Sequence, residues 1–321
     1  MTAMADEKKR IWLNKETAGL AADPSRFIAR NSGFVYIFCA FISWPIITVL
    51  QLFREHMGVD AYFISAMTVP YVLMLLVIAA FALGYRRPEL LGFSNPKWHN
   101  MIICPLLIFS AYPLMMLVSA LSRTLFPKSA LEVTDTANSV LLSIGPVWGF
   151  IVLAVVPAIC EELLCRGLIF GAFRKRSFLA AYLISAVSFS IVHGNIEQML
   201  YAFVLGLLLG LVREFSGSAV PCMLMHFLFN SVSAFSIYFG DVFGSLFGAE
   251  LEQGSGRLDV TGFFVLLFAS TVVMCVLLVL MKRANGYSFL LKSEDDDKSA
   301  PAITVTYVIG WAISIAMGIL S

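Results

Sequence analysis

The sequence predicts an all-α fold, a polytopic membrane bundle of about eight or nine transmembrane helices. Hydrophobic residues make up 59% of its 321 positions and charged residues only 13%. Soluble domains carry about 25% charged residues, so this chain has too little charge for a hydrated surface around a soluble core. The mean hydropathy is +0.85. The apolar residues also gather in runs close to the 20 or so residues that a helix needs to cross a bilayer.

Nine such runs follow one another along the chain. They cover residues 34–53, 62–84, 100–121, 147–170, 178–193, 197–212, 219–240, 261–281 and 303–320. No connection resembles a folded soluble domain. We therefore divide the chain into an N-terminal tail (1–33), N-terminal spans with a far-side loop (34–145), a core segment (146–240) and C-terminal spans (241–321). The tail is too polar for a signal peptide, which needs a short apolar centre.

Basic residues alternate between two sets of connections. One set begins with the N-terminal tail and continues with Arg86 and Arg87, Arg174 to Arg176, Arg213, and Lys282 and Arg283. The other set is poorer and holds Arg54, then Arg123 and Lys128, then Arg257. Because short cytoplasmic connections carry the excess of lysine and arginine, we expect a multi-pass protein of the cell membrane with a cytoplasmic N-terminus.

Two connections are unusual. The longest far-side loop, residues 122–145, mixes apolar with polar residues, which favours a short interfacial helix. Only 36 residues lie between Arg176 and Arg213, although they must supply two spans and a turn. Two full crossings need about 20 residues each. We therefore expect a short hairpin whose tip, at Gly194 and Asn195, stops inside the membrane plane or thins the membrane locally.

Charge and cysteine content exclude two other classes. The formal net charge is +1, which gives no electrostatic basis for binding nucleic acid, and we expect no nucleic-acid partner. The six cysteines fall within apolar runs, and no pair has the spacing of a zinc knuckle or a redox motif. They are interpreted as reduced packing residues.

Three ionisable side chains interrupt the apolar run from Val147 to Phe173. They are Glu161, Glu162 and Arg166. Each such group costs about 2.5–3.5 kcal/mol at the centre of a membrane helix, even on insertion scales. Glu162 and Arg166 are four residues apart, so they share a helix face and can pair. Glu161 is turned about 100° from Glu162 and has no partner in its own helix.

The other intramembrane polar side chains lie on two further spans. His193 ends the fifth span, and His226 and Asn230 lie four residues apart on one face of the seventh. At 1.5 Å per residue, counted from the flanking basic residues, these three and Glu161 all lie roughly 20–25 Å from the cytoplasmic edge. Pro157, one turn before Glu161, is expected to leave a backbone carbonyl free.

These residue types suit the hydrolysis of an amide by an activated water. A buried carboxylate beside an imidazole, Glu161 with His193, is a plausible general base. An imidazole and an amide on one helix face, His226 with Asn230, can donate hydrogen bonds to an oxyanion as it forms. No serine or cysteine is obviously paired with a base, so a water molecule is the better candidate for the nucleophile.

Each of these residues also has a structural interpretation. A lone intramembrane histidine or asparagine often serves as an interhelical hydrogen-bonding group worth about 0.6 kcal/mol. Glu162 and Arg166 are interpreted as a neutralised clamp that supports the site. Turn or interface roles are assigned to Asn195, Glu197 and Arg213, and packing roles to Phe189, Phe227 and Phe229. The conjunction of polar groups, rather than any single one, favours function.

A metal site is a second chemical interpretation of the same residues. Two histidines and a carboxylate are a zinc-type ligand set. However, the helical His-Glu-x-x-His motif is absent, and the three residues come from three separate helices. We therefore predict that the site uses neither a metal nor a cofactor.

Three short motifs together resemble a known family. Glu161-Glu162-x-x-x-Arg166, Phe189-x-x-x-His193 and His226-x-x-x-Asn230 look like the CPBP family of CAAX prenyl endopeptidases and bacteriocin-processing or self-immunity proteins, also called Abi. The pattern is complete over about residues 145–240. The resemblance implies an intramembrane glutamate endopeptidase with a cavity open to the cytoplasm. It also implies that Glu161 and His193 activate water while His226 and Asn230 stabilise the oxyanion.

The sequence therefore leads to the hypothesis of a membrane endopeptidase, surrounded by lipid, that cleaves a peptide or protein near the inner leaflet. The resemblance implies a prenylated, and so lipidated, Cys-a-a-X substrate for eukaryotic members and other peptides for prokaryotic ones. One rival is a non-catalytic membrane scaffold or bacteriocin self-immunity protein. The other is a transporter or proton relay, which would favour paired halves with broken helices, and the sequence has no such internal symmetry.

Overall fold

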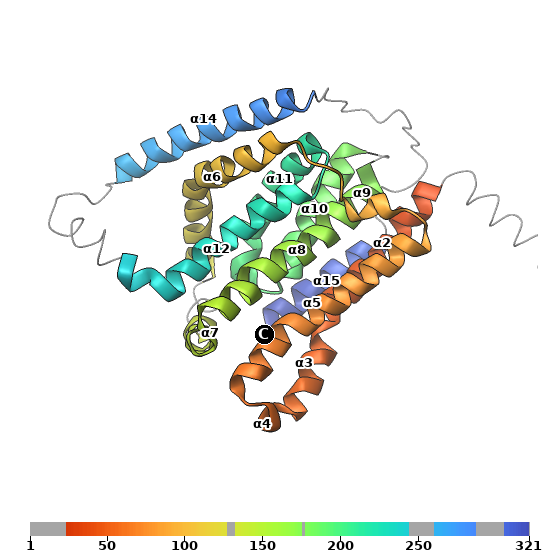
Figure 1. The fold of residues 1–321 in the computed structure, drawn as a ribbon, viewed down its shortest axis with the longest axis vertical. Helices are drawn as coiled ribbons and strands as arrows, with labels where there is room; N and C mark the ends of the chain where they lie inside the picture. Colours follow the sequence, from red (N-terminus) through yellow and green to blue (C-terminus); the bar gives the residue numbers. More distant parts are fainter. Residues whose placement is uncertain (1–23, 127–131, 175–176, 244–259, 287–304, 321) are drawn as a thin grey trace, which may run out of the picture.

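The computed structural model describes residues 24–126, 132–174, 177–243, 260–286 and 305–320 (Figure 1). Within these ranges the regular structure is helical and contains no strand, which confirms the predicted all-α bundle. Several residues used to predict orientation lie outside the described ranges, namely the tail up to residue 23, Lys128, Lys175, Arg176 and Arg257.

The helical elements follow one another along the chain, and Figure 1 labels the α-helices among them. They are α2 (Pro24–Phe41), α3 (Ser43–Leu52), α4 (Arg54–Met57), α5 (Val59–Gly84), the 3₁₀ turn η1 (Pro88–Leu91), α6 (Trp98–Leu125), α7 (Glu132–Phe150), the π-helical η2 (Ile151–Val155), α8 (Val156–Glu162), the π-helical η3 (Leu163–Ile169), α9 (Phe170–Arg174), α10 (Phe178–Val192), α11 (Ile196–Ser216), α12 (Val220–Phe243), α14 (Val260–Ala284) and α15 (Val305–Leu320).

Each of the nine predicted spans coincides with helices where the structure describes it, and residues 303 and 304 of the last span lie outside the described ranges. Among the described residues, seven helical stretches are long and apolar enough to cross a membrane: Ile28–Leu52, Val59–Gly84, Trp98–Leu125, Ser139–Arg174, Ile196–Ser216, Val220–Gly240 and Val260–Ala284. The other two predicted spans correspond to the shorter apolar helices α10 and α15. The predicted hairpin is therefore short in one arm, because α10 has 15 residues whereas α11 has 21. Its tip is at Gly194, which has a positive φ of 63°.

The first helix of the described residues, α2, begins at Pro24, earlier than the predicted start of the first span at residue 34. Proline is favoured at the first position of a helix. Ser32 of this segment is fully buried against the last described helix, α15, where its Oγ lies 2.9 Å from the Tyr307 hydroxyl. The Tyr307 ring also stacks on Tyr36, with centroids 5.5 Å apart. Thus α2 and α15, from opposite ends of the chain, lie side by side (Figure 1).

The fourth span is irregular along its length. Within α7, Gly145 has a φ of 78°, in the left-handed region that glycine adopts without strain, and Pro146 follows it. The part of α7 before Gly145 lies in the loop 122–145, so the helix expected there is present, while its interfacial position stays a prediction. Further along, the π-helical η2 and η3 flank α8. Such turns are rare and occur frequently at functional sites.

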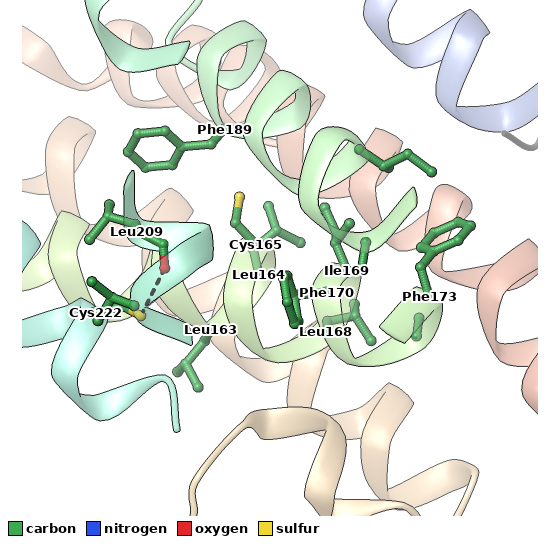
Figure 2. Close-up of a cluster of buried hydrophobic side chains, with 14 of the residues drawn as sticks. Leu163, Leu164, Cys165, Leu168, Ile169, Phe170, Phe173, Phe189, Leu209 and Cys222 are labelled. Carbon is green, nitrogen blue, oxygen red and sulfur yellow. Dashed lines mark hydrogen bonds between the residues drawn. The ribbon is translucent and has the colours of Figure 1, made fainter. Parts of the chain in front are cut away.

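The segment Leu163–Phe173 forms the centre of the core. Its apolar side chains are buried (Figure 2). On the neighbouring α12, the Cys222 thiol is buried and donates to the Leu209 carbonyl at 3.3 Å. All six cysteines are free, five are buried and Cys275 is exposed. The packing interpretation is confirmed for the five buried cysteines and is wrong for Cys275, which does not contribute to the core.

The helix α8 lies where three others can reach it. It packs against α5 and α12, and η3, which continues it, packs against α10 and α11 (Figure 1). The α10–α11 hairpin is tight, since a Cβ on Gly206 would lie 3.2 Å from the Ala186 Cα. Side chains of α5, α10 and α12 therefore converge on the acidic end of α8.

Candidate active site

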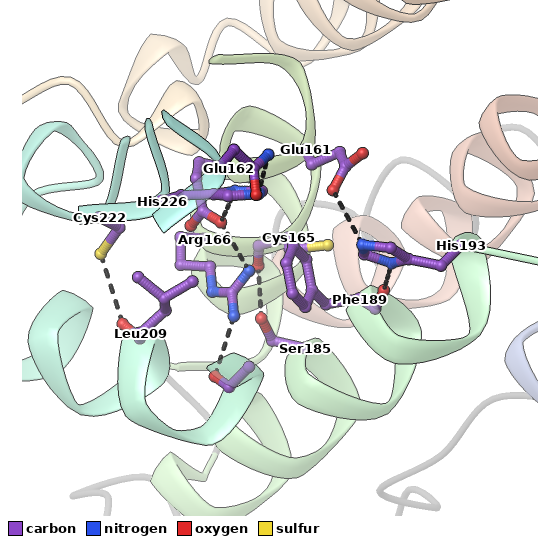
Figure 3. Close-up of polar contacts among 12 residues, drawn as sticks. Glu161, Glu162, Cys165, Arg166, Ser185, Phe189, His193, Leu209, Cys222 and His226 are labelled. Atoms are coloured by element: carbon purple, nitrogen blue, oxygen red, sulfur yellow. Dashed lines mark hydrogen bonds and ion pairs between the residues drawn. The ribbon is translucent and has the colours of Figure 1, made fainter. Parts of the chain in front are cut away.

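Glu161 and Glu162 are buried at the C-terminal end of α8, with 6% and 0% of their surfaces exposed. Consecutive residues of a helix are turned about 100° apart, so the two carboxylates meet different neighbours. Figure 3 shows Glu161 directed toward His193, and Glu162 close to His226 and Arg166. Each glutamate therefore has an imidazole of its own.

Glu161 is held by a phenol and faces a histidine. The Tyr71 hydroxyl on α5 donates to Glu161 Oε1 at 2.7 Å. The second oxygen, Oε2, is buried and has no hydrogen-bond partner among the described residues. His193 Nε2 lies 3.8 Å from this oxygen, too far for a direct hydrogen bond. Two polar atoms at such a separation can be bridged by one water.

The orientation of the His193 ring is set by its own helix. Its Nδ1 donates to the Phe189 carbonyl at 2.7 Å, because a carbonyl oxygen can only accept. In the neutral imidazole Nε2 then carries the lone pair, and Nε2 is the atom that faces Glu161. The His193 side chain is 18% exposed, against 8% for Glu161 and 2% for His226, so this side of the site is the more open one.

Glu162 belongs to a sealed cluster. Its Oε1 accepts from Arg166 Nη1 at 2.9 Å and lies 3.1 Å from His226 Nδ1. The other end of the guanidinium, Nη2, donates to the Gly206 carbonyl on α11 at 2.9 Å. The Glu162 and Arg166 side chains are 0% exposed. The predicted pair is present, and it connects α8 with α11 and α12.

Asn230 links His226 to the irregular part of the fourth span. Its Nδ2 donates to the Leu153 carbonyl at 3.0 Å and lies 3.1 Å from His226 Nε2. Leu153 is four residues before Pro157, which has no N–H to donate to it. The carbonyl that Pro157 was expected to leave free is therefore bound by the Asn230 amide.

The Phe189 ring separates the two halves of the site (Figure 3). It lies edge to face with His193, at a centroid distance of 5.0 Å, and with His226, at 5.3 Å. The Arg166 guanidinium lies over it at 4.4 Å, in cation–π geometry. The predicted packing role is confirmed, and what Phe189 packs against is the ionisable cluster itself.

The structure brings together all six residues that the sequence singled out. Glu161 and His193 form one contact, and Glu162, Arg166, His226 and Asn230 form a second. Their chemical roles stay predictions. Three other polar residues have the predicted turn and interface roles: the Asn195 side chain caps the start of α11, Glu197 pairs with Arg123 at 3.3 Å, and Arg213 Nε donates to the Arg166 carbonyl at 2.9 Å.

Sequence reasoning missed Tyr71. It lies in the second apolar run, far along the chain from residues 145–240, and tyrosine is not conspicuous in a membrane span. A signal was available, because the hydroxyl of a buried tyrosine usually finds a hydrogen-bond partner. Tyr71 lies midway along α5, so its partner had to be another deeply placed polar group.

In the described part of the chain, no group of three or more His, Cys, Asp or Glu side chains is arranged to hold a metal ion. His193 approaches Glu161, whereas His226 approaches Glu162. The two imidazoles therefore do not converge on one carboxylate, and a mechanism without metal stays a prediction.

The helices and the site define a class, a multi-pass α-helical membrane protein with ionisable side chains from several helices gathered in its interior. Residues 143–232 match the family model described as type II CAAX prenyl endopeptidase Rce1-like. The match covers less than a third of the chain and confirms the resemblance to the CPBP family over that segment. At the family level it supports a CAAX-type intramembrane protease. No curated protein and no solved structure matches the chain.

Proposed function

We propose that this protein is an intramembrane endopeptidase that hydrolyses a peptide bond with a water activated by Glu161 and His193. The observation that supports this most directly is the pair of facing acceptors, Glu161 Oε2 and His193 Nε2, 3.8 Å apart. Each can accept one hydrogen bond from the same water. The water oxygen then has its lone pairs free for a carbonyl carbon of the substrate.

In the proposed step, the water oxygen bonds to the scissile carbonyl carbon as the water gives a proton to Glu161 Oε2. His193 accepts a hydrogen bond from the other O–H, whose hydrogen stays on the attacking oxygen, and so orients that oxygen. The carbonyl becomes a tetrahedral oxyanion, the carbon–nitrogen bond then breaks, and Glu161 returns the proton to the departing nitrogen. One peptide bond and one water give one carboxylic acid and one amine.

We assign the oxyanion to His226 and Asn230. Their nitrogens, Nε2 and Nδ2, are 3.1 Å apart, so one oxygen can lie within hydrogen-bond distance of both. In the resting arrangement the Asn230 amide donates to His226 Nε2. On its Nδ1 side the His226 ring donates to the Glu162 carboxylate, which holds the ring with Nε2 toward Asn230.

The family match supports a proposal for the substrate class. We propose a peptide with a prenylated Cys-a-a-X terminus, cleaved on the C-terminal side of the modified cysteine, and approached from the inner leaflet. The alternation of basic residues supports a cytoplasmic N-terminus and the corresponding placement of the protein in the cell membrane.

The test of the base is Glu161→Gln in the 321-residue chain in liposomes. The probe is a farnesylated Cys-a-a-X peptide, and release of its C-terminal tripeptide is followed by mass spectrometry. Glutamine keeps an oxygen for the Tyr71 hydroxyl to donate to, so the variant loses the base while retaining this contact. We expect turnover to fall by at least about 10²-fold.

The matched control is Glu89→Gln. Glu89 is exposed and pairs with Arg87 at the surface, where such pairs contribute little, so its turnover should equal the wild type. Wild-type turnover by Glu161→Gln would rule out the proposed base. Cleavage of an unprenylated peptide at the rate of the farnesylated one would rule out the prenyl requirement and leave the hydrolytic mechanism standing.

A further inference from the structure

Tyr71 reaches the candidate base from outside the segment that carries the family motifs. It lies on α5, whereas the match begins at residue 143. Its hydroxyl makes the one hydrogen bond to the Glu161 carboxylate that is found among the described residues. His193 at 3.8 Å does not hold this carboxylate directly.

We propose that Tyr71 is a positioning residue of the hydrolytic site, which fixes the Glu161 carboxylate so that Oε2 rather than Oε1 takes the proton from water. This inference rests on the proposed function. The two oxygens of an isolated carboxylate are equivalent. A donor on Oε1 makes them different, because it occupies Oε1 and leaves Oε2 facing His193.

The carboxylate needs such a donor because no other hydrogen bond restrains it in the part of the chain that the structure describes. A glutamate side chain has three rotatable bonds, and hydrogen bonds to ionised groups are stronger than those between neutral groups. Glu162, its neighbour, is held by Arg166. Without the phenol, the Glu161 carboxylate is free to turn away from the position at which one water can contact both Oε2 and Nε2.

The packing around the Tyr71 ring holds its hydroxyl in a fixed place for this role. α5 packs directly against α8, and the Tyr71 ring packs against the apolar core, next to the buried Pro70. The ring therefore belongs to the packing between the helices, whereas the hydroxyl alone contacts the carboxylate. Phenylalanine would keep the ring contacts and remove the donor, so the two contributions can be separated experimentally.

The test compares Tyr71→Phe with the control Tyr182→Phe under the farnesylated-peptide assay. The Tyr182 ring stacks on Phe178 in α10, so that variant also removes a half-buried hydroxyl, but away from the site. For Tyr71→Phe we expect kcat to fall by about 10- to 100-fold, since a hydrogen bond to a charged group is lost. KM should change by less than about threefold, because the hydroxyl acts on the base and not on substrate binding.

The outcomes separate this inference from the proposed function. If Glu161→Gln is inactive while Tyr71→Phe has the kcat of the wild type, the inference is overturned and the proposed function stands. If Tyr71→Phe raises KM and leaves kcat unchanged, Tyr71 is a binding or packing residue and the inference fails as well. If Glu161→Gln retains full turnover, both fail.

A second measurement does not depend on the Tyr71 variant folding. Infrared difference spectra of wild type minus Glu161→Gln are recorded with ordinary tyrosine and with ring-¹³C tyrosine. A hydroxyl that loses a charged acceptor changes its C–O stretching frequency, so we expect an isotope-sensitive tyrosine band in the difference spectrum. A spectrum without any tyrosine band overturns the contact on which the inference is based.

Discussion

Glu161 and Glu162 are neighbours in the sequence, but the structure gives them opposite surroundings. Glu162 shares its carboxylate with a guanidinium and an imidazole, and the pair that it forms with Arg166 is 0% exposed. Glu161 accepts from a neutral phenol and faces His193, which is 18% exposed. One carboxylate is neutralised and enclosed, and the other has no permanent cation and lies on the open side.

The difference indicates which carboxylate has a chemical task. A buried charge is tolerated at low cost only when it is paired and hydrogen-bonded, and Glu162 meets that condition. Glu161 meets it less well, because its one hydrogen bond comes from the neutral Tyr71 hydroxyl and no lysine or arginine pairs with it among the described residues. Both glutamates leave Oε2 without a hydrogen-bond partner, so the contrast lies in the cation and in the exposure of the neighbouring side chains. A carboxylate retained in a membrane helix without a cation is a functional candidate.

The largest expected effects come from replacing either histidine with alanine, His193 in the open half of the site beside Glu161 or His226 in the sealed half beside Glu162. His193→Ala removes an acceptor of the activated water and should lower turnover by about 10²–10⁴-fold. Its stability should change by only about 1 kcal/mol, because His193 makes a single hydrogen bond among the described residues, to a carbonyl of the preceding helix. His226→Ala should lower stability by about 1–3 kcal/mol, because Glu162 and Asn230 each lose a buried partner.

The catalytic effect of each variant is measured as turnover of the farnesylated peptide. Its stability is measured as the midpoint of unfolding in a denaturing detergent. If the two alanine variants lose the same stability, the site is not divided into an open and a sealed half. If His193→Ala cleaves at the wild-type rate, the open half is not where water is activated.

The sequence was sufficient to predict the helices and which polar side chains lie close together. Spacing of four residues placed Glu162 with Arg166 and His226 with Asn230 on shared faces, and both pairs are in contact. Counting residues from basic loops predicted a similar depth for the polar groups, and these groups do lie close together. These predictions hold because helical rise and rotation are local properties of the chain.

The sequence was not sufficient to predict which groups face each other. Depth is one coordinate, and the rotation of a helix about its own axis is set by packing with its neighbours. The π-helical η2 and η3 also change the rotation per residue on both sides of α8. For this reason the allocation of His193 to Glu161 and of His226 to Glu162, and the contact from Tyr71, appear only in three dimensions.

The next effect in size concerns the sealed half. Arg166→Met leaves Glu162 without its cation and frees the Gly206 carbonyl, so we expect a loss of about 3–5 kcal/mol in the free energy of unfolding. Glu162→Gln combined with Arg166→Met should be more stable than Arg166→Met alone, because no unpaired charge then stays buried. Arg87→Met, at an exposed pair, should change stability by less than about 1 kcal/mol.

Detergent unfolding of these variants provides the measurement. A double variant as unstable as Arg166→Met would show that the guanidinium matters for its other contacts, including Phe189, rather than for the charge of Glu162. In that case the sealed half would be held together by packing, and Glu162 would not differ from Glu161 in having its charge neutralised.

The smallest expected effect tests whether Asn230 has two roles, one as a structural hydrogen-bond donor and one as a donor to the oxyanion. Asn230→Ala removes the donor to the Leu153 carbonyl, at a cost of about 1 kcal/mol. Pro157→Ala gives the helix its own N–H for that carbonyl, so in this background the cost of Asn230→Ala should fall by about 0.5–1 kcal/mol.

The loss of turnover caused by Asn230→Ala should be the same in both backgrounds, because an N–H at residue 157 does not replace the amide beside His226. Equal stability costs in the two backgrounds would show that the Leu153 carbonyl does not depend on Asn230, and recovery of turnover would show that Asn230 acts only through the shape of the fourth span.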